Sequence, residues 1–236
     1  MNLGMYVGLA ALALAACDGK TLADRDPPGS DSLECGADVA GGDPMNASNW
    51  RIGPMLRING DWTNRSVGIP RQPTQVGLEW YFDIPRQGGS VHYVTFNHGP
   101  LTGKTRIRMR YRVDMAEDVH IWPKTAEPPA PSIITLYFQR RGDDWSADAE
   151  HETHRWFASF AMQMPISAGE HEIIAPLDSN WTAIMTSSRE SNPTGFAAAL
   201  ANAQCVGFVL GGGDGLGHGA WADGPARLII EEFAVE

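Results

Sequence analysis

Basic residues and long hydrophobic runs are both scarce in this sequence of 236 residues. Lys and Arg number 18 against 28 Asp and Glu, which gives a formal net charge of −10. We therefore expect no nucleic-acid partner, because such binding depends mostly on a positive surface that faces the phosphates. No internal repeat of roughly 20 to 50 residues is visible. With 43% hydrophobic and 19% charged residues, the composition excludes collagen, coiled coil and polytopic membrane protein and predicts one globular domain.

The N-terminal apolar run, residues 1–16, is too short to cross a membrane. A helix needs about 20 residues to span a hydrocarbon core of roughly 30 Å. We interpret the run as a signal peptide, although residues 1–9 lack the Lys or Arg with which such peptides usually begin.

Four residues at the end of this run resemble the lipobox of bacterial lipoproteins, namely Leu14, Ala15, Ala16 and Cys17. The resemblance implies that Cys17 becomes the acylated first residue of the mature chain, carrying fatty acids such as palmitate. It also implies a lipid bilayer as partner and a location in the bacterial cell envelope, either periplasmic or surface-exposed. An ordinary cleaved signal peptide is the alternative.

Residues 17–45 are rich in Asp, Gly and Pro, so we expect a flexible tether between the lipid and the body. After Cys17 this segment has seven acidic and two basic residues, and it therefore holds half of the net charge. An oxidising compartment would allow Cys35 in the tether to form a disulfide with Cys205 in the body. The alternative for Cys205 is a buried free thiol.

The body, residues 46–236, contains short runs rich in β-branched and aromatic residues, separated by Gly, Pro, Asp or Asn. This pattern is typical of a β-sandwich. Strands are expected at about residues 77–84, 91–97, 105–113, 133–140, 155–162, 171–177, 181–186, 206–210 and 226–235, and one helix at 196–202. The predicted fold is all-β, a jelly-roll β-sandwich of two antiparallel sheets with one short helix.

The C-terminal sequence VGFVLGGGDGLGHGAWADGPARLIIEEFAVE predicts a strand, a glycine-rich loop and a long closing strand. In the closing strand, Glu231 and Glu232 interrupt the alternation and indicate a β-bulge. This arrangement resembles the end of galactose-binding-like jelly rolls, which include certain carbohydrate-binding modules and the complex I intermediate-associated protein family. The resemblance covers residues 75–236 and implies the fold. Such proteins have binding, assembly or enzymatic roles, so it assigns no site residue.

Four arginines alternate with apolar residues in the run 105–113, namely Arg106, Arg108, Arg110 and Arg112. Side chains of a strand point to opposite faces in turn, so these arginines should form a stripe about 20 Å long. The residues between them should face the core, namely Ile107, Met109, Tyr111 and Val113. Because guanidinium pairs with carboxylates or sulfates, Arg108 and Arg110 are candidate ligand-binding residues for an anionic polymer. The alternative is a solvated face that cross-strand acids such as Glu79 or Asp83 neutralise.

A second candidate site lies in residues 136–157, where polar and aromatic side chains surround a long loop. Aromatic rings pack against the CH face of a sugar, while amide, carboxylate and guanidinium groups bind its hydroxyls. The alternative is that Trp145 and Trp156 cover the core and the polar residues only hold the loop. The candidates for a glycan site are Tyr137, Gln139, Trp145, Arg155 and Trp156, with Arg140, Asp143, His151 and His154 nearby.

The sequence HETH places His151 and His154 at a spacing that one metal ion could bridge, with Glu152 nearby. Further ligands for a tetrahedral zinc site are not evident locally, so we predict no metal at these residues. A calcium ion held by Asp214 or Asp223 is the other metal considered, because carboxylates supply hard oxygen ligands. No cofactor is expected.

The glycine-rich run at residues 211–219 matches neither the Rossmann nor the P-loop pattern, so we expect no nucleotide there. Its glycines should instead permit positive φ and tight packing between two strands. Loops at the end of a sandwich often bind ligands. His218 and Trp221, together with Asp214, are therefore further candidates for a ligand site.

No motif in the body specifies a reaction. GxSxG is absent, and the carboxyl separation that a glycosidase needs cannot be derived for the paired acids, which are Glu79 with Asp83 and Glu150 with Glu152. The residue types that a lyase needs are present in Arg108, Tyr137, Gln139 and His154. We predict a lipid-anchored envelope protein that binds a glycan or another polar ligand without catalysis. The alternatives are an assembly or scaffolding lipoprotein that binds a protein partner, and a polysaccharide lyase or glycoside hydrolase.

Overall fold

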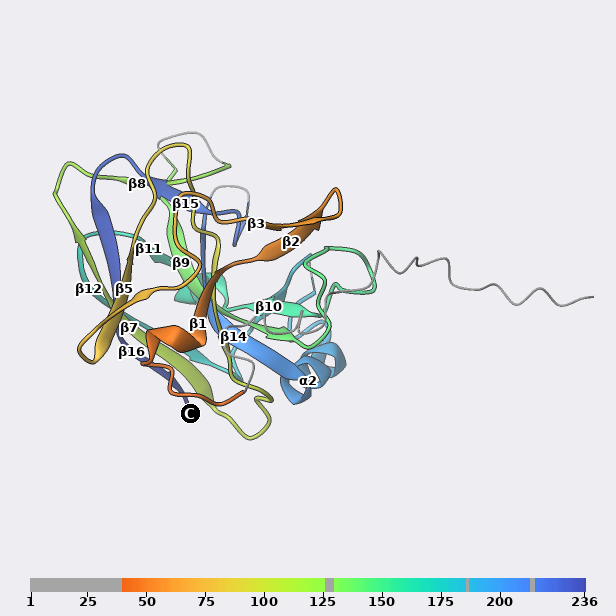
Figure 1. Cartoon of the computed structure of the whole chain (residues 1–236). Helices are drawn as coiled ribbons and strands as arrows, with labels where there is room; N and C mark the ends of the chain where they lie inside the picture. The colour runs from red at the N-terminus through yellow and green to blue at the C-terminus, as the bar shows by residue number, and fades with distance from the viewer. Residues whose placement is uncertain (1–39, 126–129, 186, 213–214) are drawn as a thin grey trace, which may run out of the picture.

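The computed structural model describes residues 40–125, 130–185, 187–212 and 215–236. Two antiparallel sheets pack as a sandwich, which confirms the predicted all-β class (Figure 1). The expected signal peptide, the lipidation site Cys17 and the cysteine Cys35 lie outside the described residues. Those three expectations therefore stay predictions.

The first sheet contains seven strands: β1 (Trp50–Gly53), β6 (Tyr93–Asn97), β9 (Ile133–Arg140), β10 (Arg155–Phe157), β11 (Met164–Pro165), β13 (Thr182–Ala183) and β14 (Ala203–Gly211). Their order is β1-β6-β14-β9-β10-β13, and β11 also pairs with β9. The second sheet contains five strands: β4 (Thr74–Val76), β5 (Glu79–Asp83), β7 (Arg106–Met115), β12 (Gly169–Pro176) and β16 (Ala226–Val235). Their order is β12-β7-β16-β5-β4.

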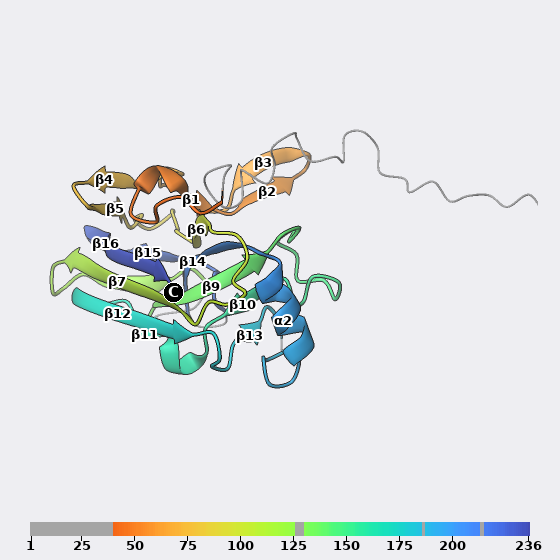
Figure 2. The same cartoon turned by 90° about the horizontal axis from the view of Figure 1, so that it is seen from below.

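The path of the chain between the sheets is that of a jelly roll. Strands β5, β7, β12 and β16 belong to one sheet, and the strands between them in the sequence, β6, β9, β10 and β14, belong to the other. This alternation places β5-β16-β7-β12 opposite β6-β14-β9-β10. Figure 2 shows both series of strands in this order from top to bottom. The predicted jelly roll is confirmed.

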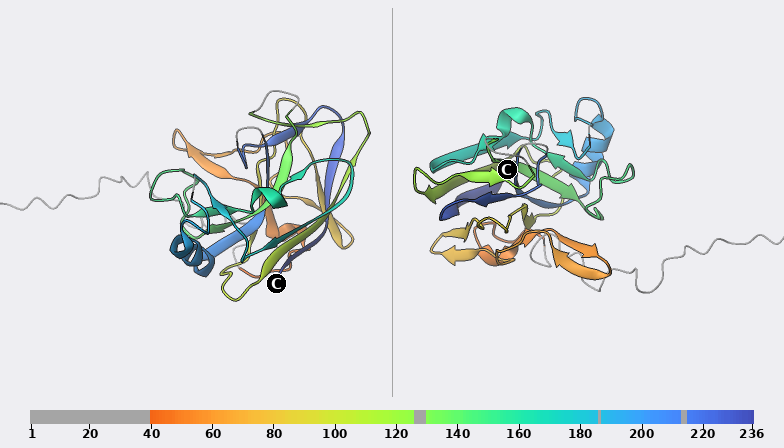
Figure 3. Two further views of the ribbon diagram at one scale, coloured as in Figure 1. Left: turned by 180° about the vertical axis from the view of Figure 1, so that it is seen from behind. Right: turned by 90° about the horizontal axis from the view of Figure 1, so that it is seen from above.

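In the described residues, two small ribbons and one α-helix lie outside the main sheets. The ribbons pair β2 (Met55–Ile58) with β3 (Asp61–Asn64), and β8 (Ile121–Pro123) with β15 (Ala220–Ala222). Helix α2 (Pro193–Ala201) begins earlier than expected, because Asn192 caps it by accepting a hydrogen bond from the N–H of Gly195 at 2.9 Å. Figure 3 shows α2 and the β2–β3 hairpin on opposite sides of the molecule.

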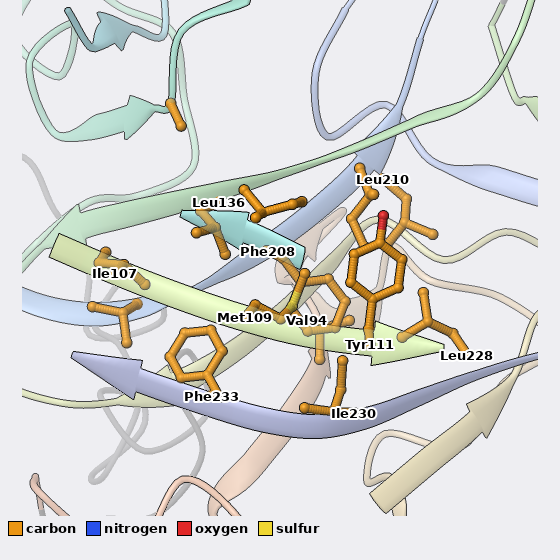
Figure 4. Packing of buried hydrophobic residues seen from close by; sticks show 14 of the residues in the cluster. Val94, Ile107, Met109, Tyr111, Leu136, Phe208, Leu210, Leu228, Ile230 and Phe233 are labelled. Carbon is orange, nitrogen blue, oxygen red and sulfur yellow. The ribbon is translucent and has the colours of Figure 1, made fainter. Parts of the chain in front are cut away.

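The core lies between the sheets and is built by alternation. On β7, Ile107, Met109 and Tyr111 are fully buried, as the sequence predicts, and the arginines between them point away from the core. In Figure 4 these side chains meet Phe208 of β14 and Phe233 of β16. The stripe of arginines therefore occupies the outer face of the five-stranded sheet.

The predicted bulge on the closing strand is confirmed. The register between β16 and β7 shifts between Ile230 and Glu232, so Glu231 is the extra residue. Both glutamates then lie beside the arginines of β7, and their side chains are 16% and 32% exposed.

The described contacts of the body begin before the boundary expected at residue 46. The N–H of Gly41 donates to the carbonyl of Asn97 at 3.0 Å. The carbonyl of Pro44 accepts hydrogen bonds from the indole nitrogens of Trp50 and Trp80, at 2.7 and 3.1 Å. Both indoles are fully buried, so residues 41–45 belong to the folded body.

Cys205 lies on the central strand β14, where it is 1% exposed. It takes part in a disulfide bond. Both other cysteines of the chain lie outside the described residues, so the pairing with Cys35 stays a prediction.

Candidate functional site

A groove of about 760 Å³ lies over the outer face of the seven-stranded sheet. Alternation in the strands creates this second face. On β6, Val94 and Phe96 point into the sandwich core, whereas Tyr93 belongs to a separate apolar cluster. The β2–β3 hairpin lines the groove with Leu56, and the loop between β9 and β10 lines it with Trp145.

Aromatic rings form the floor of the groove. Tyr93 of β6 meets Tyr137 of β9 edge to face, with 5.1 Å between ring centroids. Phe157 of β10 stacks beside Tyr137 at 6.3 Å. The ring of Trp145 stands against Tyr93 at 4.9 Å and 75°. Such pairs stabilise one another by about 1 kcal/mol beyond their buried area, so this floor is preformed.

A buried ion pair lies beneath the floor. The Nε of Arg155 is 2.6 Å from Oδ2 of Asp143, and the two side chains are 4% and 0% exposed. Burial raises the pKa of Asp143 to about 6, although the charge of Arg155 opposes this shift. Asp143 is therefore ionised at pH 7 and balances the charge of Arg155 there.

The same carboxylate positions Trp145. Oδ1 of Asp143 accepts a hydrogen bond from the backbone N–H of Trp145 at 3.1 Å. Trp145 has φ of 66°, in the left-handed region that costs a residue with a side chain about 1 kcal/mol or more. The guanidinium of Arg155 lies 5.1 Å from the centroid of the Trp145 ring. Strained residues held by their surroundings often occur at binding sites, and this one places an indole in the groove wall.

His92 connects the floor to the glycine-rich loop. Its ring is 3% exposed, with Nε2 at 3.0 Å from Oγ of Ser90 and Nδ1 at 3.0 Å from the carbonyl oxygen of Gly217. Burial lowers the pKa of His92 to about 4, so the ring is neutral at pH 7. A neutral ring satisfies both bonds when Nδ1–H donates to Gly217 and Nε2 accepts from Ser90.

The structure brings three of the predicted site residues together at this groove, namely Trp145, Arg155 and His218. Three others lie beneath the surface. Tyr137 is fully buried under the floor, and Trp156 lies in the sandwich core. Gln139 is also fully buried, and its amide nitrogen and oxygen have no hydrogen-bond partner among the described residues.

Trp221 lies on the neighbouring ribbon of β8 and β15, directly opposite Trp122, and both rings are half-buried. The two carboxylate oxygens of Asp223 accept hydrogen bonds from the N–H of His120 at 2.8 Å and the indole of Trp122 at 3.0 Å. Asp223 therefore orders this ribbon. Asp214, the other residue considered for calcium, lies outside the described residues.

The arginine stripe lies on the other sheet, away from the groove, and acids surround it. Arg108 pairs with Glu232 and, at 3.2 Å, with Glu172. Nε of Arg110 is 3.8 Å from Glu232 and 4.0 Å from Glu231. The remaining pairs join Glu236 to Arg106 and Arg108, and Arg112 to Asp114 and Glu231.

The acids expected to neutralise the stripe, Glu79 and Asp83, do not do so among the described contacts. Both lie on β5, which β16 separates from β7. Asp83 pairs with Arg227 at 2.6 Å instead. Strands β16 and β12 flank β7, so they supply the acids.

The HETH residues contact one another and the segment after β13. The rings of His151 and His154 lie 4.7 Å apart and nearly perpendicular. A carboxylate oxygen of Glu152 accepts the N–H of Ser187 at 3.0 Å. In the described ranges, no group of three or more His, Cys, Asp or Glu side chains is placed to hold a metal ion.

Sequence reasoning missed four of the residues that line the groove, namely Arg65, Tyr93, Lys124 and Phe157. Tyr93 and Phe157 lie in strands in which every residue is buried, so no alternation of buried and exposed residues separates the two faces. Arg65 and Lys124 follow strands of three or four residues, which are too short to give a periodic pattern.

No protein-family model matches this chain, and no curated protein sequence does either. Within the part of the chain that the structure describes, no helix has the length and apolar character needed to span a membrane.

Proposed function

We propose that the groove binds a glycan, or another polar ligand of the cell envelope, without catalysis. The protein would act while anchored to a membrane through a lipid on Cys17. Its location in the bacterial envelope and its lipid anchor rest on the lipobox-like sequence alone.

The observation that supports binding is the junction of Trp145, Tyr93 and Arg155 at one groove. Sugar sites combine an aromatic face with polar groups that fix the hydroxyls. Here the indole forms a wall, the phenol ring forms the floor, and a guanidinium lies against the indole. The volume of about 760 Å³ falls in the usual range for small-ligand sites.

A glycan array with the purified protein tests the proposal. The variant Trp145→Ala should lose most of the binding, since stacked rings supply much of the affinity at such sites. Trp62→Ala is a matched control, because Trp62 is also half-buried but does not line the groove. Equal binding by both variants, or no binding of any glycan by the unaltered protein, would reject the proposal.

A further inference from the structure

The basic residues of the groove differ from the arginine stripe on the other sheet. Each of the four arginines on β7 pairs with at least one Glu or Asp. Arg65 and Lys124 line the groove, and neither forms an ion pair with any residue of the described ranges. Both side chains are exposed, so they are available to a ligand.

Arg65 and Lys124 come from different elements and lie close enough to affect one another. Arg65 follows β3, and its N–H bonds the carbonyl of Pro54 at 2.8 Å. Lys124 follows β8, and its N–H bonds the carbonyl of Gly219 at 2.8 Å. Partial burial and the charge of Arg65 lower the pKa of Lys124. Both cations also oppose protonation of His92 on the floor.

The described lining of the groove contains no Asp or Glu to balance these charges. Asp143 is committed to Arg155, and its side chain is fully buried. This composition is unusual for a chain in which 28 acidic residues outnumber 18 basic ones. Among the described residues no acid balances Arg65 and Lys124, and a bound anion would do so.

We infer that Arg65 and Lys124 bind the carboxylate or sulfate of an acidic sugar whose ring packs against Trp145. This inference rests on the proposed glycan binding and specifies the class of glycan. The planar guanidinium of Arg65 can donate two parallel hydrogen bonds to either group, and the ammonium of Lys124 supplies a second positive charge. Neutral sugars would leave both cations without a partner.

Matched pairs of oligosaccharides test the inference by calorimetry with the full-length protein. One pair is an oligogalacturonide and its methyl ester, and the other is a sulfated oligosaccharide and its desulfated form. We expect the acidic member of at least one pair to bind at least tenfold more tightly, with affinity that falls as salt is raised. Arg65→Gln and Lys124→Gln should each weaken that binding about tenfold.

Arg110→Gln is the matched control, because Arg110 is an exposed arginine of the other sheet that already has acid partners. It should bind as the unaltered protein does. Equal affinity for acidic and neutral members of both pairs would overturn the acidic-sugar inference and leave the proposed glycan function standing. If Arg110→Gln weakened binding of the acidic sugar and Arg65→Gln did not, the inference would also be overturned, because the sugar would then bind at the arginine stripe. Binding of none of the four oligosaccharides would overturn the acidic-sugar inference, and the glycan array would then decide the proposed function.

Discussion

His92 should make the protein less stable in mild acid. Its folded-state pKa is about 4, whereas an unfolded histidine titrates near 6.5. As the pH falls below about 6.5, the unfolded chain takes up a proton that the folded protein cannot accept. Stability that is present at neutral pH is therefore lost as the pH falls towards 4.

The two pKa values set the size of the effect. Between pH 7 and pH 4.5 the difference in proton uptake amounts to about 2.5 kcal/mol of unfolding free energy. That loss is a large part of the stability of an ordinary domain. The structural cause is local, because a charged ring would be desolvated beside Ser90 and would lose the acceptor at Nε2.

Urea unfolding at a series of pH values, compared between the protein and His92→Asn, measures how much His92 contributes to the pH dependence of the unfolding free energy. The amide of the variant can still donate to the carbonyl of Gly217 but does not titrate, so its stability should fall about 2.5 kcal/mol less over the same range. The comparison is needed because Asp143 has an opposite effect. Its pKa is raised to about 6, so its protonation stabilises the folded protein as the pH falls through 6.

Parallel pH profiles for the protein and His92→Asn would refute this reasoning. They would mean that the ring is already charged at neutral pH or that the fold opens around it at little cost. The link between the groove floor and the Gly217 loop would then be weaker than the hydrogen bond indicates.

Three further predictions concern the sheet and the groove. Gly207→Ala should destabilise the protein by about 3 kcal/mol or more in urea unfolding, because the new Cβ would lie 2.0 Å from the carbonyl oxygen of Val94. Trp145→Gly should be more stable than Trp145→Ala by about 1 kcal/mol, since only glycine adopts the left-handed backbone without cost, while both lose glycan binding. As the pH falls through about 6, Asp143 becomes neutral and no longer balances the buried charge of Arg155, so affinity for a sulfated glycan should rise severalfold. Asp143→Asn should bind that glycan tightly already at pH 7 and show a smaller rise.

The sequence predicts where the strands of the sandwich lie in the chain better than it predicts which strands pair with one another. Alternation along β7 identifies the face of each side chain, because that face depends only on position in the strand. The partners of the arginines depend on sheet order, which brings β16 beside β7 from more than a hundred residues away. For this reason the sequence places the arginines on one face, whereas the alternative partners Glu79 and Asp83 lie on a strand that does not adjoin β7.

The groove was predicted only in part, for a related reason. Trp145 and Arg155 occur in one polar segment, so their combination is visible in the sequence. Arg65 and Lys124 are distant in sequence and adjoin short ribbons, and only the folded chain brings them to the same groove. The left-handed backbone of Trp145 was not predicted, since no residue type near it demands that conformation.

The neutralised arginine stripe determines how the molecule appears to a charged particle at a distance. Each positive group there has a carboxylate within 4.0 Å, so the potential of that face cancels over a few ångströms. On a chain with a net charge of −10, Arg65 and Lys124 then make the groove a local positive region. A polyanion diffusing towards the protein would be turned towards the groove before contact, and its association rate would fall with ionic strength.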